Sequence, residues 1–208
     1  MTDGWELAAK ARRDYADLVE PLDDRADEKT LCGDWTVHHV TAHLASFVDI
    51  GFPSFFVNMA KHKFDYDRAA DTLARRLAGR PMTELIASLR EKAGKNSAIP
   101  IFPGEMTATD VVVHTQDVRR GLSLDGAPDP ELVETALVFL STDKKATAIV
   151  GKGKYDGLRF ESTDSSWSHG DGAIVSGPAE ALMMAMAGRP VYDELNGDGA
   201  AILQQRFS

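Results

Sequence analysis

The feature that most constrains this 208-residue chain is the stretch TATDVVVHTQDVRRGL at residues 107–122. Read as a helix, with 100° per residue, it places Asp110, His114 and Asp117 in one narrow sector beside Val111 and Val118. Ionisable groups therefore border directly on the face that the folded chain should bury. An unpaired carboxylate in that position is costly or has a strongly shifted pKa. A bound cation is the simplest compensation.

A second helical stretch carries a histidine in the same kind of setting. Thr36 is a candidate N-cap, and on the helix that follows, His43 lies within an apolar face, with His39 at its edge. Asp110 and His114 lie four residues apart, which places two ligands on one face of a helix. A third ligand from a neighbouring helix would complete a site with open positions for water or substrate.

The pattern therefore predicts a metal site formed by His43, Asp110 and His114. The alternative is that both histidines are core residues, with Asp110 as their hydrogen-bond partner. A single D-x-x-x-H pair does not distinguish the two interpretations.

The remaining pattern predicts a mostly helical α+β protein. Helical periodicity covers residues 4–22, 36–50, 65–95 (interrupted at 79–81) and 107–122, with a loop at 96–105, which is typical of a four-helix bundle. After residue 122 the expected elements are a helix from Asp129, a strand at 158–162, one or two short strands at 167–175, a helix closed by Gly188, and a helix or strand at 197–207. We expect a metal-binding bundle over residues 1–124 and an α+β region over 125–208, with the boundary between 124 and 145.

The composition excludes several classes of protein. The net charge of -9, with scattered Lys and Arg, argues against a nucleic-acid partner. The single cysteine, Cys32, excludes an intramolecular disulfide and a thiolate-rich zinc site, and we expect it to be a packing residue. No apolar run is long enough to cross a membrane, and no secretory signal is visible, so we expect a cytoplasmic protein.

Two motifs resemble those of a known family. LCGDWTVHHVTAHL, at residues 31–44, is similar to the W-T-V-x-x-V-x-x-H-L signature of the mycothiol-dependent maleylpyruvate isomerase family, which belongs to the DinB-like metal-binding four-helix superfamily. DVVVHTQD, at residues 110–117, resembles the second motif of that family, E-x-x-x-H-x-x-D. WSHG, VSGP and AGR, followed by LNGDG, are similar to its carboxy-terminal pattern, so the likeness covers nearly the whole chain.

The resemblance implies a divalent metal, typically zinc, on one histidine of the second helix and on an acid and a histidine of the fourth. Carried over to this sequence, these ligands are His43, Asp110 and His114. Two positions depart from the family pattern, because Asp110 replaces the usual Glu and His39 stands where Asp is common. We expect His39 either to orient His43 or to be an extra ligand.

Three further residues are candidates for supporting roles. Asp117 is expected either to accept a hydrogen bond from an imidazole and fix its tautomer or to pair with an arginine. Arg189 follows Gly188 and either satisfies carbonyls at a helix end or, as the resemblance implies, contacts an anionic thiol or a substrate carboxylate. His169 lies in a predicted turn, which favours a hydrogen-bonded loop residue over a catalytic one.

The resemblance implies a metal-dependent enzyme in which mycothiol or a similar small thiol attacks a small electrophile. Isomerisation and S-transfer are both compatible with that chemistry, and the chain is expected to be a monomer or a homodimer. The alternatives are a non-catalytic metal- or ligand-binding protein and a hydrolase that uses metal hydroxide on the same ligands.

Overall fold

The computed structural model describes residues 2–96 and 102–208, without the side chains of residues 148 and 149. The chain divides into two compact units, Met1–Ala127 and Pro128–Ser208, which are described separately below. The predicted fold class, a helical bundle accompanied by a smaller α+β region, is confirmed. Within the described ranges, no helix is long and apolar enough to span a bilayer.

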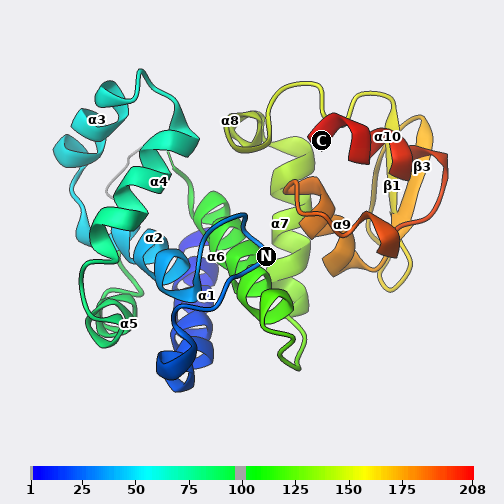
Figure 1. Cartoon of the computed structure of the whole chain (residues 1–208). Coiled ribbons are helices and arrows are strands. Elements are labelled where there is room, and N and C mark those ends of the chain that lie inside the picture. Colours follow the sequence, from blue (N-terminus) through cyan, green and yellow to red (C-terminus); the bar gives the residue numbers. More distant parts are fainter. Residues whose placement is uncertain (1, 97–101) are drawn as a thin grey trace. The chain divides into compact units, whose positions relative to one another are not determined.

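The first unit is built from helices. They are α1 (Gly4–Val19), the 3-10 helix η1 (Glu20–Arg25), α2 (Val37–Asp49), α3 (Phe52–Lys61), α4 (Tyr66–Leu77), α5 (Met82–Glu91) and α6 (Gly104–Gly121). α1 packs along α6, and α2 packs against α4 and α5 (Figure 1). The bundle therefore consists of α1, α2, α5 and α6, and α4 covers one side of α2.

The helix predicted at residues 107–122 is confirmed, and it begins earlier than expected, at Gly104. Of the loop predicted at 96–105, residues 97–101 lie outside the described residues, whereas Gly104 and Glu105 are helical. Glycine is required at this helix start, because a Cβ on Gly104 would lie 2.3 Å from the carbonyl carbon of Gly4. The two glycines let the first turns of α1 and α6 approach backbone to backbone.

α3 is a helix that the sequence pattern did not predict. The segment at Gly51 and Pro53 looks like a helix end, but Pro53 lies in the first turn of a new helix, where proline is well tolerated. α3 presents several apolar side chains to solvent, as does the turn that follows it: Phe52, Phe56, Val57 and Phe64.

The second unit combines helices with a small sheet. Its elements are α7 (Pro130–Thr142), η2 (Lys144–Ala146), α8 (Thr147–Val150), β1 (Leu158–Ser162), β2 (Ser168–Gly170), β3 (Ala173–Gly177), α9 (Ala179–Met186), η3 (Tyr192–Glu194) and α10 (Asp198–Phe207). β1 is central, antiparallel to β2 and parallel to β3. The predicted strands are confirmed, and the segment left open at 197–207 is a helix.

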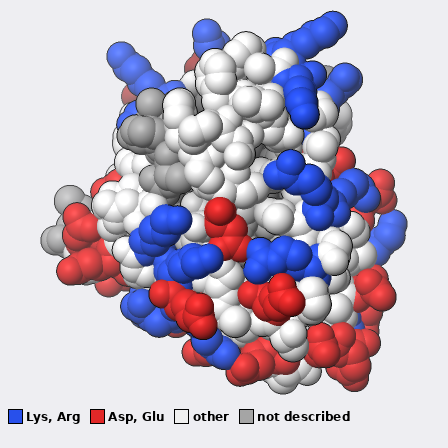
Figure 2. All heavy atoms as spheres, turned by 90° about the vertical axis from the view of Figure 1, so that its left-hand side faces the viewer, with Lys and Arg blue, Asp and Glu red and all other residues white. Residues whose placement is uncertain are grey.

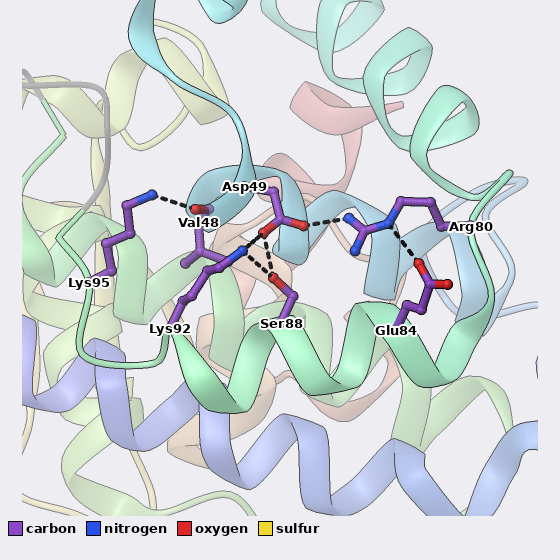
Figure 3. A network of polar contacts seen from close by, with 7 residues as sticks. All are labelled: Val48, Asp49, Arg80, Glu84, Ser88, Lys92 and Lys95. Atoms are coloured by element: carbon purple, nitrogen blue, oxygen red, sulfur yellow. Dashed lines mark hydrogen bonds and ion pairs between the residues drawn. The ribbon is translucent and has the colours of Figure 1, made fainter.

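A buried carboxylate ties the end of α2 to α5. Asp49, with a side chain 10% exposed, pairs with Arg80 at 2.5 Å and with Lys92 at 2.6 Å, and it accepts a hydrogen bond from Ser88 (Figure 3). Burial raises the pKa of Asp49, but the hydrogen bonds from Lys92, Ser88 and Arg80 outweigh burial, and the net pKa lies below its usual value. The ionised form is therefore favoured in the folded state.

We predict that Asp49→Asn lowers the free energy of unfolding at pH 7 by about 1–2 kcal/mol, because Arg80 and Lys92 lose their partner while staying partly solvated. A depressed pKa stabilises the fold above the unfolded value and loses that effect as the pH falls through the folded value. The difference between the two proteins should therefore shrink below about pH 4, as urea denaturation between pH 3 and 7 would show.

Glu84 provides the control for this network. It lies 3.5 Å from Arg80 but is 59% exposed, so Glu84→Gln should change the stability by less than about 0.5 kcal/mol. Equal effects of the two substitutions would contradict the role assigned to Asp49.

Candidate metal centre

The start of α2 determines how its histidines are used. Thr36 is the N-cap, as predicted, and its side chain accepts a hydrogen bond from the backbone N–H of His39. The ring Nδ1 of His39 in turn accepts from the backbone N–H of Thr36 at 3.3 Å and lies 2.9 Å from its hydroxyl. His39 therefore acts as the reciprocal partner in a capping box, a position usually taken by Glu or Gln. His43, one turn further along, is buried.

The structure brings together the three residues predicted as ligands. His43 Nε2 lies 3.4 Å from Asp110 Oδ2, and His114 Nε2 lies 3.8 Å from Asp110 Oδ1. One ligand atom from each of the three residues lies within 4.8 Å of the others. Two imidazoles and a carboxylate at this spacing form a donor set suited to a divalent cation.

The distances between these ligand atoms can be compared with the distances between ligand atoms in a site that holds zinc. Donors at 2.0–2.1 Å from a tetrahedral zinc ion lie about 3.4 Å apart, whereas the usual N–H···O hydrogen bond is about 2.9 Å. The two distances from the histidines to Asp110 match the first value better than the second. The residues present therefore fit a metal ion.

Asp117 holds one of the imidazoles in place. Its carboxylate is 0% exposed, and Oδ2 lies 2.9 Å from Nδ1 of His114. Because Nδ1 is engaged there, Nε2 is the ring nitrogen that faces Asp110. The geometry matches the first role expected for Asp117, support of an imidazole.

The electrostatics of the cluster favour positive charge. Burial lowers the pKa of His114, but the hydrogen bond to Asp117, the neighbouring Cys32 and the charge of Asp110 outweigh burial and raise the pKa to about 10. A cluster that draws a proton onto a buried imidazole at neutral pH is one that attracts cations.

Aromatic rings enclose the two histidines. The Trp35 ring lies 5.0 Å from that of His43 and stacks at 5.8 Å on that of His114, while Phe47 meets His43 edge-on at 5.1 Å. Trp35 is fixed by a hydrogen bond from Nε1 to Asp71 at 2.8 Å. The centre thus lies in an environment of low polarity, which strengthens its electrostatic interactions.

Arg12, on α1, belongs to the surroundings of the site and was missed in the sequence. It is 1% exposed and donates from Nη1 to the carbonyl oxygens of Ala93 and Lys95, at 2.8 and 2.6 Å. Burial lowers its pKa to about 10, and the charge of Asp110 acts in the opposite direction. The available signal was its position in the apolar pattern of α1, one turn before the buried Tyr15.

Cys32 differs from its expected role as a packing residue. It is only half-buried, and its sulfur lies within 4.8 Å of ligand atoms of both His114 and Asp117. Sequence reasoning missed this proximity, because Cys32 precedes α2 whereas both neighbours lie on α6. The loop is docked there by a hydrogen bond from the backbone N–H of Leu31 to the carbonyl of Asp117, at 2.9 Å.

The two remaining candidates lie in the second unit. Nη1 of Arg189 donates to the carbonyl of Ala187 at 2.9 Å, just beyond the end of α9, a contact that is compatible with the helix-end role and leaves the second role as a proposal. His169 is exposed on β2, opposite Phe160 of β1, and so lies in one of the short strands predicted at 167–175 rather than in a turn.

The sequence of the first unit matches a known protein family over most of its length. Residues 8–98 match the family model described as mycothiol maleylpyruvate isomerase N-terminal domain. The first unit is therefore similar to that domain. The match includes His43 and ends before α6, so Asp110 and His114 are placed by the structure and not by the family model.

The fold as a whole also has solved relatives. The crystal structure of a mycothiol-dependent maleylpyruvate isomerase is similar, with a TM-score of 0.58 and 16% identity over 95% of this chain and 91% of that one. The structure of a histidine-to-alanine mutant of a mycothiol-dependent maleylpyruvate isomerase matches with the same values. At this identity the likeness concerns the fold alone. Comparison of the sequence with curated proteins found no match.

We predict that Asp117→Asn lowers the free energy of unfolding of the metal-free protein by about 1–3 kcal/mol, because a buried imidazole loses a charged acceptor. Urea denaturation at pH 7 measures the change. Glu105→Gln is the control on the same helix, since Glu105 is exposed in the first turn of α6, and it should cost less than about 1 kcal/mol. A smaller effect at Asp117 than at Glu105 would contradict a fixed imidazole.

Proposed function

We propose that the protein is a metal-dependent enzyme of the mycothiol-dependent isomerase type, in which a small thiol attacks a small electrophile. The single observation that carries the proposal is the group of two buried histidines, His43 and His114, and the partly buried Asp110, whose ligand atoms lie within 4.8 Å of one another. The match of residues 8–98 to the isomerase family and the shared fold support it.

His43, Asp110 and His114 are the proposed metal ligands, and zinc is the proposed metal, because two imidazoles and one carboxylate are a usual set at catalytic zinc sites. When bound, such a cation lowers the pKa of a coordinated thiol and so supplies a thiolate nucleophile. Asp110 reaches less far than the Glu of the family motif, and its two oxygens face the two histidines separately.

The neighbouring residues have supporting tasks in this proposal. Asp117 fixes the tautomer and orientation of His114 through Nδ1. Trp35 and Phe47 pack on the imidazoles and limit the access of water. Arg12 partly balances the charge of Asp110 from the α1 side.

In the isomerase reaction the thiol is regenerated. Its sulfur adds to one carbon of an electron-poor cis double bond, the resulting single bond rotates, and the sulfur leaves as the double bond reforms in the trans geometry. In S-transfer the same attack ends with expulsion of another group, and the thiol is consumed. The protein requires no nucleophile of its own in either reaction, which agrees with a site built from metal ligands.

The metal assignment predicts the same loss of metal when either His43 of α2 or His114 of α6 is replaced. The purified protein should hold about one divalent metal per chain, and His43→Ala or His114→Ala should weaken binding at least tenfold, by loss of a ligand. His38→Ala is the control, because His38 contacts the carbonyl of Arg80 at 2.9 Å and belongs to neither candidate group. Metal analysis and competition with a chelator measure the affinity; metal retained in both ligand variants would refute the assignment.

The thiol assignment predicts that the metal-loaded protein isomerises an electron-poor cis alkene only when mycothiol or a comparable thiol is present. The thiol concentration should stay constant in isomerisation and fall in S-transfer.

Arg189 is proposed to contact the thiol or the substrate, so Arg189→Lys should raise KM for one of them by about tenfold, whereas Arg159→Lys, at an exposed position of β1, should not. No thiol-dependent turnover across a broad panel would instead favour a hydrolase or a binding protein.

A further inference from the structure

Exposed aromatic side chains of the first unit gather on α3 and on the turn that follows it. Phe52, Phe56 and Phe64 are 44%, 51% and 61% exposed, and Val57, next to Phe56, is 53% exposed. The ring centroids of Phe52 and Phe56 lie 6.1 Å apart, and those of Phe56 and Phe64 lie 5.9 Å apart. The three rings form one continuous apolar surface, and we call it, together with Val57, the α3 patch.

Exposure of large apolar side chains in the first unit is concentrated in this patch. Among the described residues, the other exposed side chains of this kind all lie in the second unit: Val138, Ile174 and Ile202. Single exposed apolar residues are normal on a protein surface, whereas a contiguous group marks an interaction surface.

The opposite side of α3 is anchored within the first unit. Asn58 is buried, and its side-chain amide donates to the carbonyl of Ala69 on α4 at 2.8 Å. The Phe55 ring meets that of Phe102 edge-on, with centroids 6.1 Å apart. Helix α3 thus packs on its neighbours with one face and directs aromatic side chains to solvent with the other.

The turn after α3 holds Phe64 in an unusual backbone conformation. Lys63 and Phe64 have φ values of 55° and 63°, in the left-handed region that favours glycine. The backbone N–H of Phe64 donates to the carbonyl of Met59 at 2.8 Å, which closes the end of the helix. A bulky aromatic residue is uncommon in this conformation and is kept there at a conformational cost.

The charges next to the patch are positive. Residues 50–64 contain no aspartate or glutamate, and Lys61 and Lys63 are exposed. The ion pairs of the described residues include neither lysine. The acids at the two ends of this segment, Asp49 and Asp65, are each paired with an arginine.

Figure 2 shows the face of the molecule that carries α3 and α4. Uncharged side chains predominate in the upper half of the view, at the height of α3, whereas acidic side chains gather mainly in the lower half. The net charge of the chain is -9, but charges further away than about 8 Å are largely screened at physiological ionic strength. The two lysines therefore dominate the field at the patch.

A second copy of the chain would gain little by covering this patch. A large aromatic side chain buries about 150–250 Å² when fully enclosed, so three half-exposed rings and one valine offer on the order of 300–400 Å². A stable protein–protein interface usually buries about 800 Å² on each partner. The patch by itself is too small for a stable dimer.

A lipid bilayer requires neither that area nor a complementary shape. Helices that bind at the membrane interface present aromatic and aliphatic side chains on one face, with lysines beside them. The apolar side chains insert between headgroups and acyl chains, and anionic headgroups attract the lysines. The α3 patch and its two lysines match both parts of this pattern.

We propose that the α3 patch docks the first unit on a bilayer surface that contains anionic lipid. Phe52, Phe56 and Phe64 insert below the headgroups, and Lys61 and Lys63 contact the headgroup phosphates and carboxylates. The docking does not depend on the proposed thiol-dependent activity, because none of these residues belongs to the candidate metal centre.

Sedimentation of the whole chain with sucrose-loaded vesicles tests the docking. One set of vesicles is pure phosphatidylcholine, and the other contains about 30% phosphatidylserine. At about 0.1 M salt the partition coefficient should be at least about tenfold higher on the anionic vesicles, because the lysines contribute only there. Equal partitioning onto both, or no binding to either, would overturn the proposal.

Matched pairs of substitutions locate the binding surface. Phe56→Ser/Phe64→Ser should lower the partition coefficient on anionic vesicles at least about tenfold, through loss of two inserting rings. Val138→Ser/Ile202→Ser removes two exposed apolar side chains of the second unit and should change it by less than about twofold. An equal loss in both double variants would contradict docking through α3.

The lysines are tested in the same way. Lys61→Gln/Lys63→Gln should lower binding to anionic vesicles about tenfold, whereas the same charge change at exposed lysines of η2, Lys144→Gln/Lys145→Gln, should have less than about a twofold effect. Equal effects would show that binding follows the net charge and not the patch.

Phe56→Trp keeps an aromatic ring in place and distinguishes insertion from surface adsorption. On anionic vesicles its added emission should shift to the blue and be quenched by lipids brominated on their acyl chains, whereas that of Val138→Trp should not. Absence of quenching in Phe56→Trp would refute insertion. A dimer that Phe56→Ser/Phe64→Ser abolishes, in the absence of vesicle binding, would assign the patch to a second copy and overturn the proposal.

Discussion

Burial of the Asp117 carboxylate against His114 is the interaction on which the first unit depends. A fully buried carboxylate is tolerated only with a close partner, and Nδ1 of His114 provides one at 2.9 Å. That bond determines which face of the imidazole is free, so Nε2 is directed towards Asp110 and His43. The same turn of α6 receives the loop before α2, through the hydrogen bond from Leu31 to the Asp117 carbonyl. One buried pair therefore orients a proposed ligand and lies where α6 meets that loop.

The first unit combines this charged centre with an apolar pocket at its side. Trp35 and Phe47 surround the imidazoles, and the pocket between α2, α3 and α4 continues the apolar environment away from His43. Low polarity strengthens every charge interaction inside the centre, and it also raises the free energy of any charge that enters without a partner. The low polarity around the imidazoles therefore favours a cation at this centre.

Much of the architecture could be predicted from periodicity alone. A helix repeats every 3.6 residues, so Asp110 and His114 necessarily share a face wherever the helix packs, and the cap at Thr36 sets the start of α2. α3 could not be predicted in this way, because a proline after a glycine looks equally like an end and a beginning. Arg12 was missed because a charged residue in an apolar pattern is normally expected at the surface, whereas in the fold the carbonyls of Ala93 and Lys95 accept hydrogen bonds from its buried guanidinium.

The sequence by itself determined the fold class, the helix faces and the residue types of the proposed ligands, since these follow from local spacing. Only the tertiary structure decided which groups meet. Cys32 and Asp117 come from elements far apart in the chain and lie together because the loop before α2 docks on α6. His39 is used in a helix cap rather than in the candidate metal group, because its ring folds back on Thr36. Contacts between distant segments depend on how the helices pack, and no local pattern of residues encodes which of these segments come together in the fold.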